Sequence, residues 1–183
     1  MPDLINGTIL IADPFLKDPN FMRTVIFLCD HEAAGSFGFV LNRKWKRVVS
    51  ELVPDLADCN FPVHYGGPVQ METLHFLHRC PDVISGGVEI TDGIFWGGNF
   101  EEVSVLIQSN WIKENQIRFF AGYSGWSEGQ LEEEVKEKSW LTTKGNKKLV
   151  FHHDENLVWQ DAIKQIGGEY EQIIHYPIDP TLN

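Results

Sequence analysis

Short runs of β-branched, aliphatic and aromatic residues recur along this chain, and turn-forming Gly, Pro and Asp residues separate them. Runs of this length and composition are typical of β-strands. They predict strands over residues 8–12, 24–30, 37–42, 62–65, 74–78, 88–91, 94–96, 116–123 and 148–152. Because a parallel crossover needs about a dozen residues or more, the closely spaced runs between residues 61 and 96 are expected to pair largely in antiparallel fashion.

Other segments repeat their apolar residues at the helical spacing of about 3.6. They predict helices over residues 100–111, 127–138 and 155–166, with a short helical turn over 48–53. Asn99 and Ser127 are each followed, three positions on, by Glu or Gln, which is the pattern of a capping box at a helix start. Gly167 suits the left-handed residue that commonly ends a helix.

The order of these elements, without a linker or an internal repeat, indicates an α+β fold in which helices flank a mainly antiparallel sheet. A chain of 183 residues is long enough to bury one core, so a single domain over residues 1–183 is expected. Its 43% hydrophobic and 22% charged residues are typical of globular proteins rather than disordered ones.

The sequence also bears on the compartment. No stretch approaches the roughly 20 consecutive apolar residues of a membrane-spanning helix, so no membrane association is expected. Residues 1–4 lack the basic start and apolar run of an export signal. Cys29, Cys59 and Cys80 are odd in number and too far apart for a C-x-x-C site, which favours reduced thiols. Together these features predict a cytoplasmic protein.

The net charge of −11 opposes the binding of nucleic acid at long range. One segment differs from this acidic average, because residues 43–47 contain four cations and a tryptophan. Such a segment could contact phosphates and stack on bases as a surface loop, although a solvated turn is the simpler interpretation.

Residues 122–126, Gly-Tyr-Ser-Gly-Trp, lie between a predicted strand and a predicted helix. Their backbone N–H groups would converge at a helix N-terminus, where an anion is stabilised. The segment is not a nucleophile elbow, because Trp126 stands where that pattern needs Gly. The alternative is a tight strand-to-helix turn with no ligand.

Cys29 and His31 are two residues apart, so on a regular strand both would face the same side of the sheet. A histidine beside a cysteine can generate a reactive thiolate, which makes the pair a redox or nucleophilic candidate. A buried structural thiol is the alternative, because the run around Cys29 is apolar on both faces.

Metal and cofactor motifs are not found in the sequence. His75 and His78 are separated by an odd number of positions on a predicted strand and so should face opposite ways. No Walker loop or G-x-G-x-x-G motif is present. We therefore expect no metal and no cofactor.

Several ordered blocks are similar to those of one known family. They are residues 7–12 (GTILIA), 18–25 (DPNFMRTV), 29–31 (CDH), 38–43 (GFVLNR), 65–69 (YGGPV) and 121–132 (AGYSGWSEGQLE), followed by Trp140 and Leu141. On these blocks, which extend over nearly the whole chain, the sequence resembles the bacterial YqgE/AlgH family. The chain departs from the family pattern at Lys44, where Pro is usual, and at Ser124, where Ala is common.

The resemblance implies a one-domain α+β fold with a strongly bent, partly barrel-like sheet flanked by helices. It implies no established enzyme activity, and the family carries a label as a transcriptional regulator. A nucleophilic role for Ser124 is not expected, because relatives commonly have Ala there.

The leading hypothesis is therefore a cytoplasmic, non-enzymatic binding or regulatory domain that contacts a protein or a small anionic ligand. The candidate ligand-binding residues are Arg23, Asn42, Arg43, Gly66, Gly67, Gly122, Gly125 and Trp126. Two alternatives stay open. One is a transcriptional regulator that contacts nucleic acid through residues 43–47, and the other is a thiol-dependent enzyme or redox sensor that uses Cys29 and His31.

Overall fold

The structure, a computed structural model, describes residues 4–176, so the two ends of the predicted 1–183 domain lie outside the described residues. The strands are β1 (Thr8–Ala12), β2 (Val25–Glu32), β3 (Gly35–Val40), β4 (Lys44–Val48), β5 (Pro62–Tyr65), β6 (Val69–His78), β7 (Val88–Thr91), β8 (Ile94–Trp96), β9 (Ile117–Ser127) and β10 (Trp140–Lys144). The α-helices are α1 (Phe100–Gln108), α2 (Gln130–Lys136), α3 (Lys147–Val150) and α4 (Glu155–Ile166). Short 3-10 helices are η1 (Val49–Glu51), η2 (Pro54–Leu56), η3 (Glu114–Gln116) and η4 (Gly168–His175).

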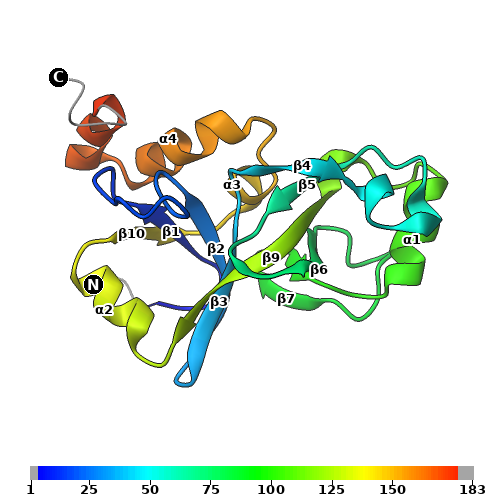
Figure 1. Cartoon of the computed structure of the whole chain (residues 1–183), viewed down its shortest axis with the longest axis horizontal. Helices are drawn as coiled ribbons and strands as arrows, with labels where there is room; N and C mark the ends of the chain where they lie inside the picture. Colours follow the sequence, from blue (N-terminus) through cyan, green and yellow to red (C-terminus); the bar gives the residue numbers. More distant parts are fainter. Residues whose placement is uncertain (1–3, 177–183) are drawn as a thin grey trace.

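The long strand β9 joins two parts of one sheet, as its diagonal course through the middle of Figure 1 shows. The sheet order is β10-β1-β2-β3-β9-β6-β8-β7, and β4 and β5 attach beside β9. The first half of β9 pairs with β5 and β6, and its last residues pair with β3. Among the described residues, every strand pair is antiparallel except β5 with β9. The antiparallel prediction for residues 61–96 therefore holds within that segment.

The sheet curls until its two outer strands meet. The Nζ atom of Lys144 in β10 lies 2.9 Å from Oδ2 of Asp92 in the β7–β8 turn. Gly7, just before β1, is so close to Thr91 that a Cβ atom on it would lie 2.5 Å from the threonine Cγ2. The predicted fold, a strongly bent and partly barrel-like sheet flanked by helices, is thus confirmed.

The buried residues form three clusters rather than the one core expected from chain length. One lies between the sheet and the helices α3 and α4, a second lies under α1, and a third lies under α2. Strand β9 contributes to each, with Phe120 in the first, Phe119 in the second and Trp126 in the third. The curled sheet has side chains to cover on both faces, and this divides the interior.

Most predicted elements are present, but one is of the wrong type. Residues 148–152 were expected as a strand, whereas Lys147–Val150 form α3. The side chain of Asn146 accepts a hydrogen bond from the Leu149 N–H at 3.0 Å and so starts a helical turn. A short apolar run cannot by itself distinguish a buried strand from a buried helical turn.

The helix predicted over residues 127–138 begins later, at Gln130, because β9 continues through Ser127. The expected pairing of these two residues does occur, since the N–H and the hydroxyl of Ser127 both donate to Oε1 of Gln130, at 3.0 and 3.2 Å. It bridges the strand end and the helix instead of capping a longer helix. Strands β4 and β10 were not predicted.

The helices predicted over residues 100–111 and 155–166 both begin at the predicted residue, but α1 ends at Gln108, three residues earlier than predicted. Asn99 accepts hydrogen bonds from the N–H groups of Glu101 and Glu102 at the start of α1. Helix α4 has the predicted bounds and ends at Gly167, whose φ is +73°. In the part of the chain that the structure describes, no helix is both long and apolar enough to cross a membrane.

Candidate functional site

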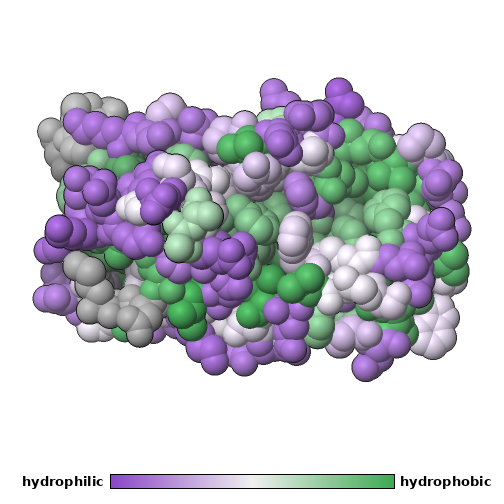
Figure 2. All heavy atoms as spheres, turned by 90° about the horizontal axis from the view of Figure 1, so that it is seen from below, coloured by the Kyte–Doolittle hydropathy of each residue, from purple (hydrophilic) through white to green (hydrophobic). Residues whose placement is uncertain are grey.

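An open groove of about 560 Å³ lies where the β2–β3 hairpin, β9, β6 and β8 come together. Its lining residues are Asp30, Glu32, Ala34, Gly35, Ser36, Phe37, Val69, His75, Trp96, Tyr123, Gly125 and Trp126. On the face seen in Figure 2, hydrophobic surface lies in recesses between projecting hydrophilic residues. This groove combines accessible aromatic side chains with charged ones and is our candidate site.

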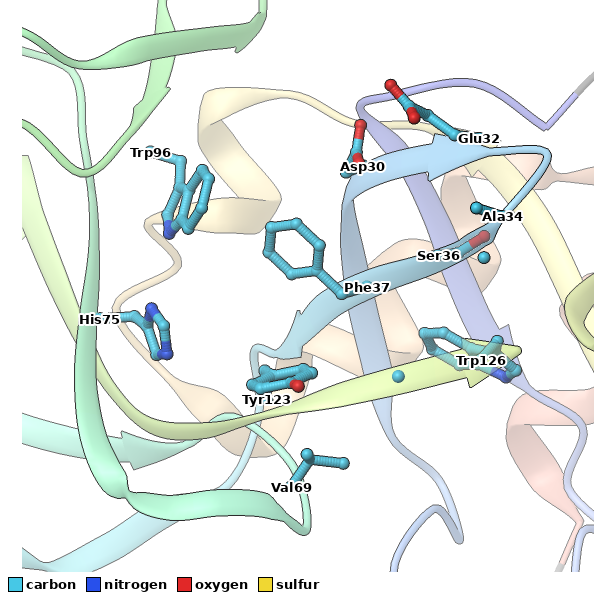
Figure 3. A pocket seen from close by; sticks show the side chains of 12 residues that line it. Asp30, Glu32, Ala34, Ser36, Phe37, Val69, His75, Trp96, Tyr123 and Trp126 are labelled. Carbon is cyan, nitrogen blue, oxygen red and sulfur yellow. The ribbon is translucent and has the colours of Figure 1, made fainter. Parts of the chain in front are cut away.

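Four aromatic or imidazole rings, from four different strands, line one side of the groove (Figure 3). The ring of Phe37 lies 5.0 Å from that of Trp96 and 6.0 Å from that of Tyr123, both in edge-to-face geometry. The imidazole of His75 lies 6.1 Å from Tyr123 and 6.3 Å from Trp96. Such edge-to-face contacts fix ring orientations before any ligand arrives.

Gly125 leaves room for this aromatic wall. It pairs directly with Phe37 across β3 and β9, and a Cβ atom on it would lie 3.3 Å from Cε2 of Tyr123. His75 is held at 3.1 Å from the Thr73 hydroxyl, and burial lowers the pKa of its imidazole. The imidazole is therefore neutral at pH 7 and acts as part of the aromatic surface.

Two carboxylates from β2, Asp30 and Glu32, lie along the opposite side of the groove (Figure 3). Asp30 accepts a hydrogen bond of 3.3 Å from the Asn6 amide. Within residues 4–176, neither carboxylate has a Lys, Arg or His nitrogen within 4 Å. The groove therefore offers uncompensated negative charge next to aromatic faces.

The anion cradle predicted at residues 122–126 is wrong, because these residues are inside β9 and do not form a turn before a helix. Gly122 has a φ of +66° at the place where β9 leaves β5 and begins to pair with β3. The backbone of residues 123–127 pairs with β6 and β3, so its N–H groups do not converge on a ligand. Of the predicted ligand-binding residues in this segment, Gly125 and Trp126 do line the groove.

Gly66 and Gly67 lie where the chain between β5 and β6 passes very close to the backbone of β9 near Gly122. The N–H of Gly66 donates to Ala121 O at 2.9 Å, and a Cβ atom on Gly67 would lie 2.2 Å from the carbonyl carbon of Tyr123. The buried Ser124 hydroxyl donates to Gly66 O at 3.1 Å. The close approach of the two backbones therefore accounts for glycine at positions 66 and 67, without a bound ligand.

Arg23, Asn42 and Arg43 lie together but away from the groove, where they hold the connection between β1 and β2. Asn42 accepts from the N–H of Val25 and donates to Arg23 O, both at 2.9 Å. Arg43 donates to Pro19 O at 3.0 Å and to Met22 O at 3.1 Å. The guanidinium of Arg23 lies over the Trp159 ring at 4.6 Å. The predicted ligand-binding set therefore divides into three groups: two residues in the groove, three glycines at the backbone crossing, and these three polar residues.

Cys29 and His31 face opposite sides of the sheet, so the expected pairing of the two is wrong. The register of β2 against β3 shifts between Leu28 and Asp30, which places a bulge at Cys29 and reverses the alternation after it. Cys29 is buried in the cluster under α3 and α4, whereas His31 points toward Glu132 of α2. Burial, followed by the charge of Asp30, raises the pKa of the Cys29 thiol well above its ordinary value, which opposes a reactive thiolate.

His31 is within hydrogen-bond distance of a hydroxyl group, since its Nδ1 lies 2.7 Å from Oγ of Ser36. Its Nε2 is 3.7 Å from a Glu132 oxygen, which is too long for a hydrogen bond. The imidazole is therefore not oriented as the base of a nucleophilic triad would be.

The basic segment at residues 43–47 is not a loop, because Lys44–Val48 form the edge strand β4. Lys44 pairs with Glu155 at 3.4 Å, and Arg43 is used inside the molecule. Lys46 and Arg47 remain exposed, and the Arg47 guanidinium lies 5.6 Å from the Trp45 ring.

The aromatic wall was missed by sequence reasoning, apart from Tyr123 as part of a motif. Alternation along β3 and β6 marks Phe37 and His75 as facing one side of their own strands, but it does not show that the two strands meet across β9. A second polar site around Arg118 was also missed, since one arginine inside an apolar strand has no local signature.

Comparison with known proteins gives a consistent result. A family model described as AlgH-like matches residues 9–171. A UPF0301 protein of Chlorobium limicola is 43% identical over 177 residues, covering 97% of this chain and 95% of that protein. A UPF0301 protein of Cytophaga hutchinsonii is 38% identical, covering 98% of this chain and all of that protein.

Solved structures show the same fold. The solution structure of the AlgH protein from Pseudomonas aeruginosa superposes with a TM-score of 0.73 at 27% identity, covering 97% of this chain and 96% of that one. A crystal structure of a Corynebacterium diphtheriae protein superposes with a TM-score of 0.75 at 20% identity, covering 95% and 93% of the two chains.

Proposed function

This chain belongs to the AlgH-like family, and from that premise and the geometry of the groove we propose that it is a non-catalytic binding domain for protein segments. The segment it takes carries a basic side chain next to an aromatic or apolar one. The carrying observation is the pairing of a preformed aromatic wall with two carboxylates that have no cationic partner among the described residues. We place this activity in the cytoplasm, which three free thiols support.

The chemistry of the groove supports a cationic group in the ligand. A Lys or Arg side chain over an aromatic face gains roughly 0.5–2 kcal/mol, more as water is removed. Carboxylates beside the aromatic face add attraction and steer the encounter. The anionic ligand expected from the sequence would meet Asp30 and Glu32 instead, so the groove favours the protein partner over that ligand.

A synthetic peptide array that varies one basic and one aromatic position tests this proposal. Binding is measured for the wild type, for the double variant D30N/E32Q, and for the control E128Q, which removes an exposed charge outside the groove. We expect the double variant to lose about tenfold in affinity for basic peptides, equivalent to about 1.4 kcal/mol, and the control to retain it. Equal binding by all three proteins, or no peptide bound by the wild type, would contradict the proposal.

A second variant tests the aromatic wall separately. Phe37→Leu keeps an apolar side chain but removes the ring that contacts Trp96 and Tyr123. The matched control is Phe15→Leu, a ring that is 56% exposed and outside the groove. We expect only the first change to weaken binding of peptides that carry a basic residue. Unchanged binding by Phe37→Leu would leave the aromatic wall without a role.

Nucleic-acid binding is a second candidate, favoured by the exposed Lys46 and Arg47 on the edge strand β4. Such contacts would be strongly salt-dependent, since phosphate neutralisation releases counterions. A gel-shift titration at low salt with the variant K46A/R47A tests it. Failure of the wild type to bind duplex or single-stranded DNA under those conditions would remove this candidate.

A further inference from the structure

A second pocket, of about 390 Å³, lies away from the aromatic groove, between the segment that precedes β9 and the connection from α3 to α4. The residues on which the argument depends are Lys113, Asn115, Arg118, His153 and Glu155. Arg118 comes from β9 and Glu155 begins α4. Lys113 and Asn115 lie at the start of η3 and within it, and His153 lies in the connection from α3 to α4. The aromatic groove shares none of these residues.

Among the described residues, Arg118 is a buried cation without a carboxylate partner. Its side chain is only 8% exposed, and within residues 4–176 no Asp or Glu oxygen lies within 4 Å of its guanidinium. The guanidinium donates to Leu41 O at 3.3 Å and to His152 O. These bonds use two of the five N–H donors of an arginine and fix the plane of the group. Buried charges are normally paired, so Arg118 stands out.

Glu155 lines the same pocket and its charge acts on Arg118, but both of its oxygens are engaged elsewhere. One of its oxygens is 3.0 Å from Nε2 of the buried His64, and the other is 3.4 Å from Nζ of Lys44. Burial would raise the pKa of Glu155, but the His64 hydrogen bond and the neighbouring charges lower it to about 2. The pKa of Arg118 is lowered by burial to about 10, so the guanidinium keeps its charge at neutral pH.

Two cations and two carboxylates line the pocket, and one of the carboxylates, Glu155, is already paired outside it. The cations are Lys113 and Arg118 and the carboxylates are Glu114 and Glu155, while Lys44 lies beside Glu155 from outside the lining. His153, which stacks on His152 with a centroid distance of 4.9 Å, provides a further N–H donor at the rim. The pocket lining is thus less acidic than the chain as a whole, whose net charge is −11.

We propose that this pocket binds a small oxyanion, a carboxylate or a phosphate group, against the guanidinium of Arg118. A planar guanidinium presents parallel N–H donors that match the two oxygens of such a group. Lys113 and Asn115, both exposed at the pocket mouth, add a charge and an amide donor. The ligand supplies the negative charge that no carboxylate of residues 4–176 places within 4 Å of the Arg118 guanidinium.

Titration of the full chain with inorganic phosphate and, separately, with acetate tests the proposal. Chemical shifts of backbone amides are followed by NMR at constant ionic strength, with chloride as the replaced ion. We expect saturable shifts at residues 113–118 and 151–154, with a dissociation constant near the millimolar range. Saturation by both ions identifies the shared oxyanion chemistry, and saturation by one identifies its source. The absence of saturable shifts with both would overturn the proposal.

Two variants assign the binding to this pocket. Lys113→Ala changes an exposed residue and should weaken binding about two- to fivefold, as expected for an exposed ion pair. The control Lys136→Ala removes an exposed lysine from α2 and should have no effect. Arg118→Gln should abolish saturation if the variant folds, and Lys113→Ala decides the matter if it does not. Equal affinity in the Lys113 and Lys136 variants would place the ion elsewhere and refute the site.

Discussion

Glu134 offers the sharpest test of how α2 is attached to the sheet. Its Oε2 accepts hydrogen bonds from two indole N–H groups, that of Trp126 at 2.9 Å and that of Trp140 at 2.8 Å. Its Oε1 accepts from Gln130 at 2.9 Å. The two indoles, 7% and 3% exposed, belong to β9 and β10, so one carboxylate connects the helix to two strands that are not neighbours in the sheet.

Replacing Glu134 with Ala should lower the free energy of unfolding by about 3 kcal/mol. A hydrogen bond to a charged group contributes about 1.5–3 kcal/mol, which gives about 3–6 kcal/mol for the two indole bonds together. Because Glu134 is only partly buried, water reaches part of the space and restores some of this loss. With a urea m-value of about 2 kcal/mol per molar, the midpoint falls by roughly 1.5 M.

Urea unfolding followed by tryptophan fluorescence measures this change, with Glu133→Ala as the matched control. Glu133 lies on the same helix but is exposed, and its removal should change stability by less than about 0.5 kcal/mol. Glu134→Gln should fall between the two, since its amide oxygen still accepts but without charge. If the midpoints of the Glu134→Ala and Glu133→Ala variants agree within about 0.25 M, the carboxylate does not anchor α2 and the reasoning is refuted.

Three further predictions concern single residues. His78 is fully buried; its Nε2 donates to Gly97 O, and its Nδ1 accepts from the Cys80 N–H. Burial lowers the pKa of its imidazole, so the unfolded chain binds a proton there at a higher pH than the folded chain does. Thermal stability should therefore be full above about pH 6.5 and decline as the pH falls through the lower folded pKa, more steeply than in His78→Gln; equal slopes would contradict this. Iodoacetamide at about pH 8 should modify native Cys80 well before the buried Cys29, as peptide mass spectrometry can show, and early modification of Cys29 would reopen its redox role. Gly67→Ala should lower the free energy of unfolding by about 3 kcal/mol or more, measured by thermal unfolding. Gly129 is also at positive φ but has open space around it, so Gly129→Ala should cost only about 1–2 kcal/mol. Similar losses in the two variants would show that the backbones at Gly67 are not in tight contact.

Local patterns in the sequence determined the elements themselves. The bounds of β1, β5, β7, β8 and α4 agree with those predicted from residue type, turn residues and capping residues. These signals depend on residues that are close in the chain, so they can be recognised without knowledge of the fold. Where the pattern was short and apolar, as in α3, it did not distinguish a helical turn from a strand.

The chemistry of the surface was decided by tertiary structure. The bulge at Cys29 sends Asp30 to the groove and His31 to the opposite face, and the register that produces it depends on the pairing of β2 with β3. Phe37, His75 and Tyr123 meet only because β9 joins both parts of the curled sheet. Strand register and curvature arise from contacts between distant segments, so a pattern read along one strand indicates which residues share a face but not what that face will meet.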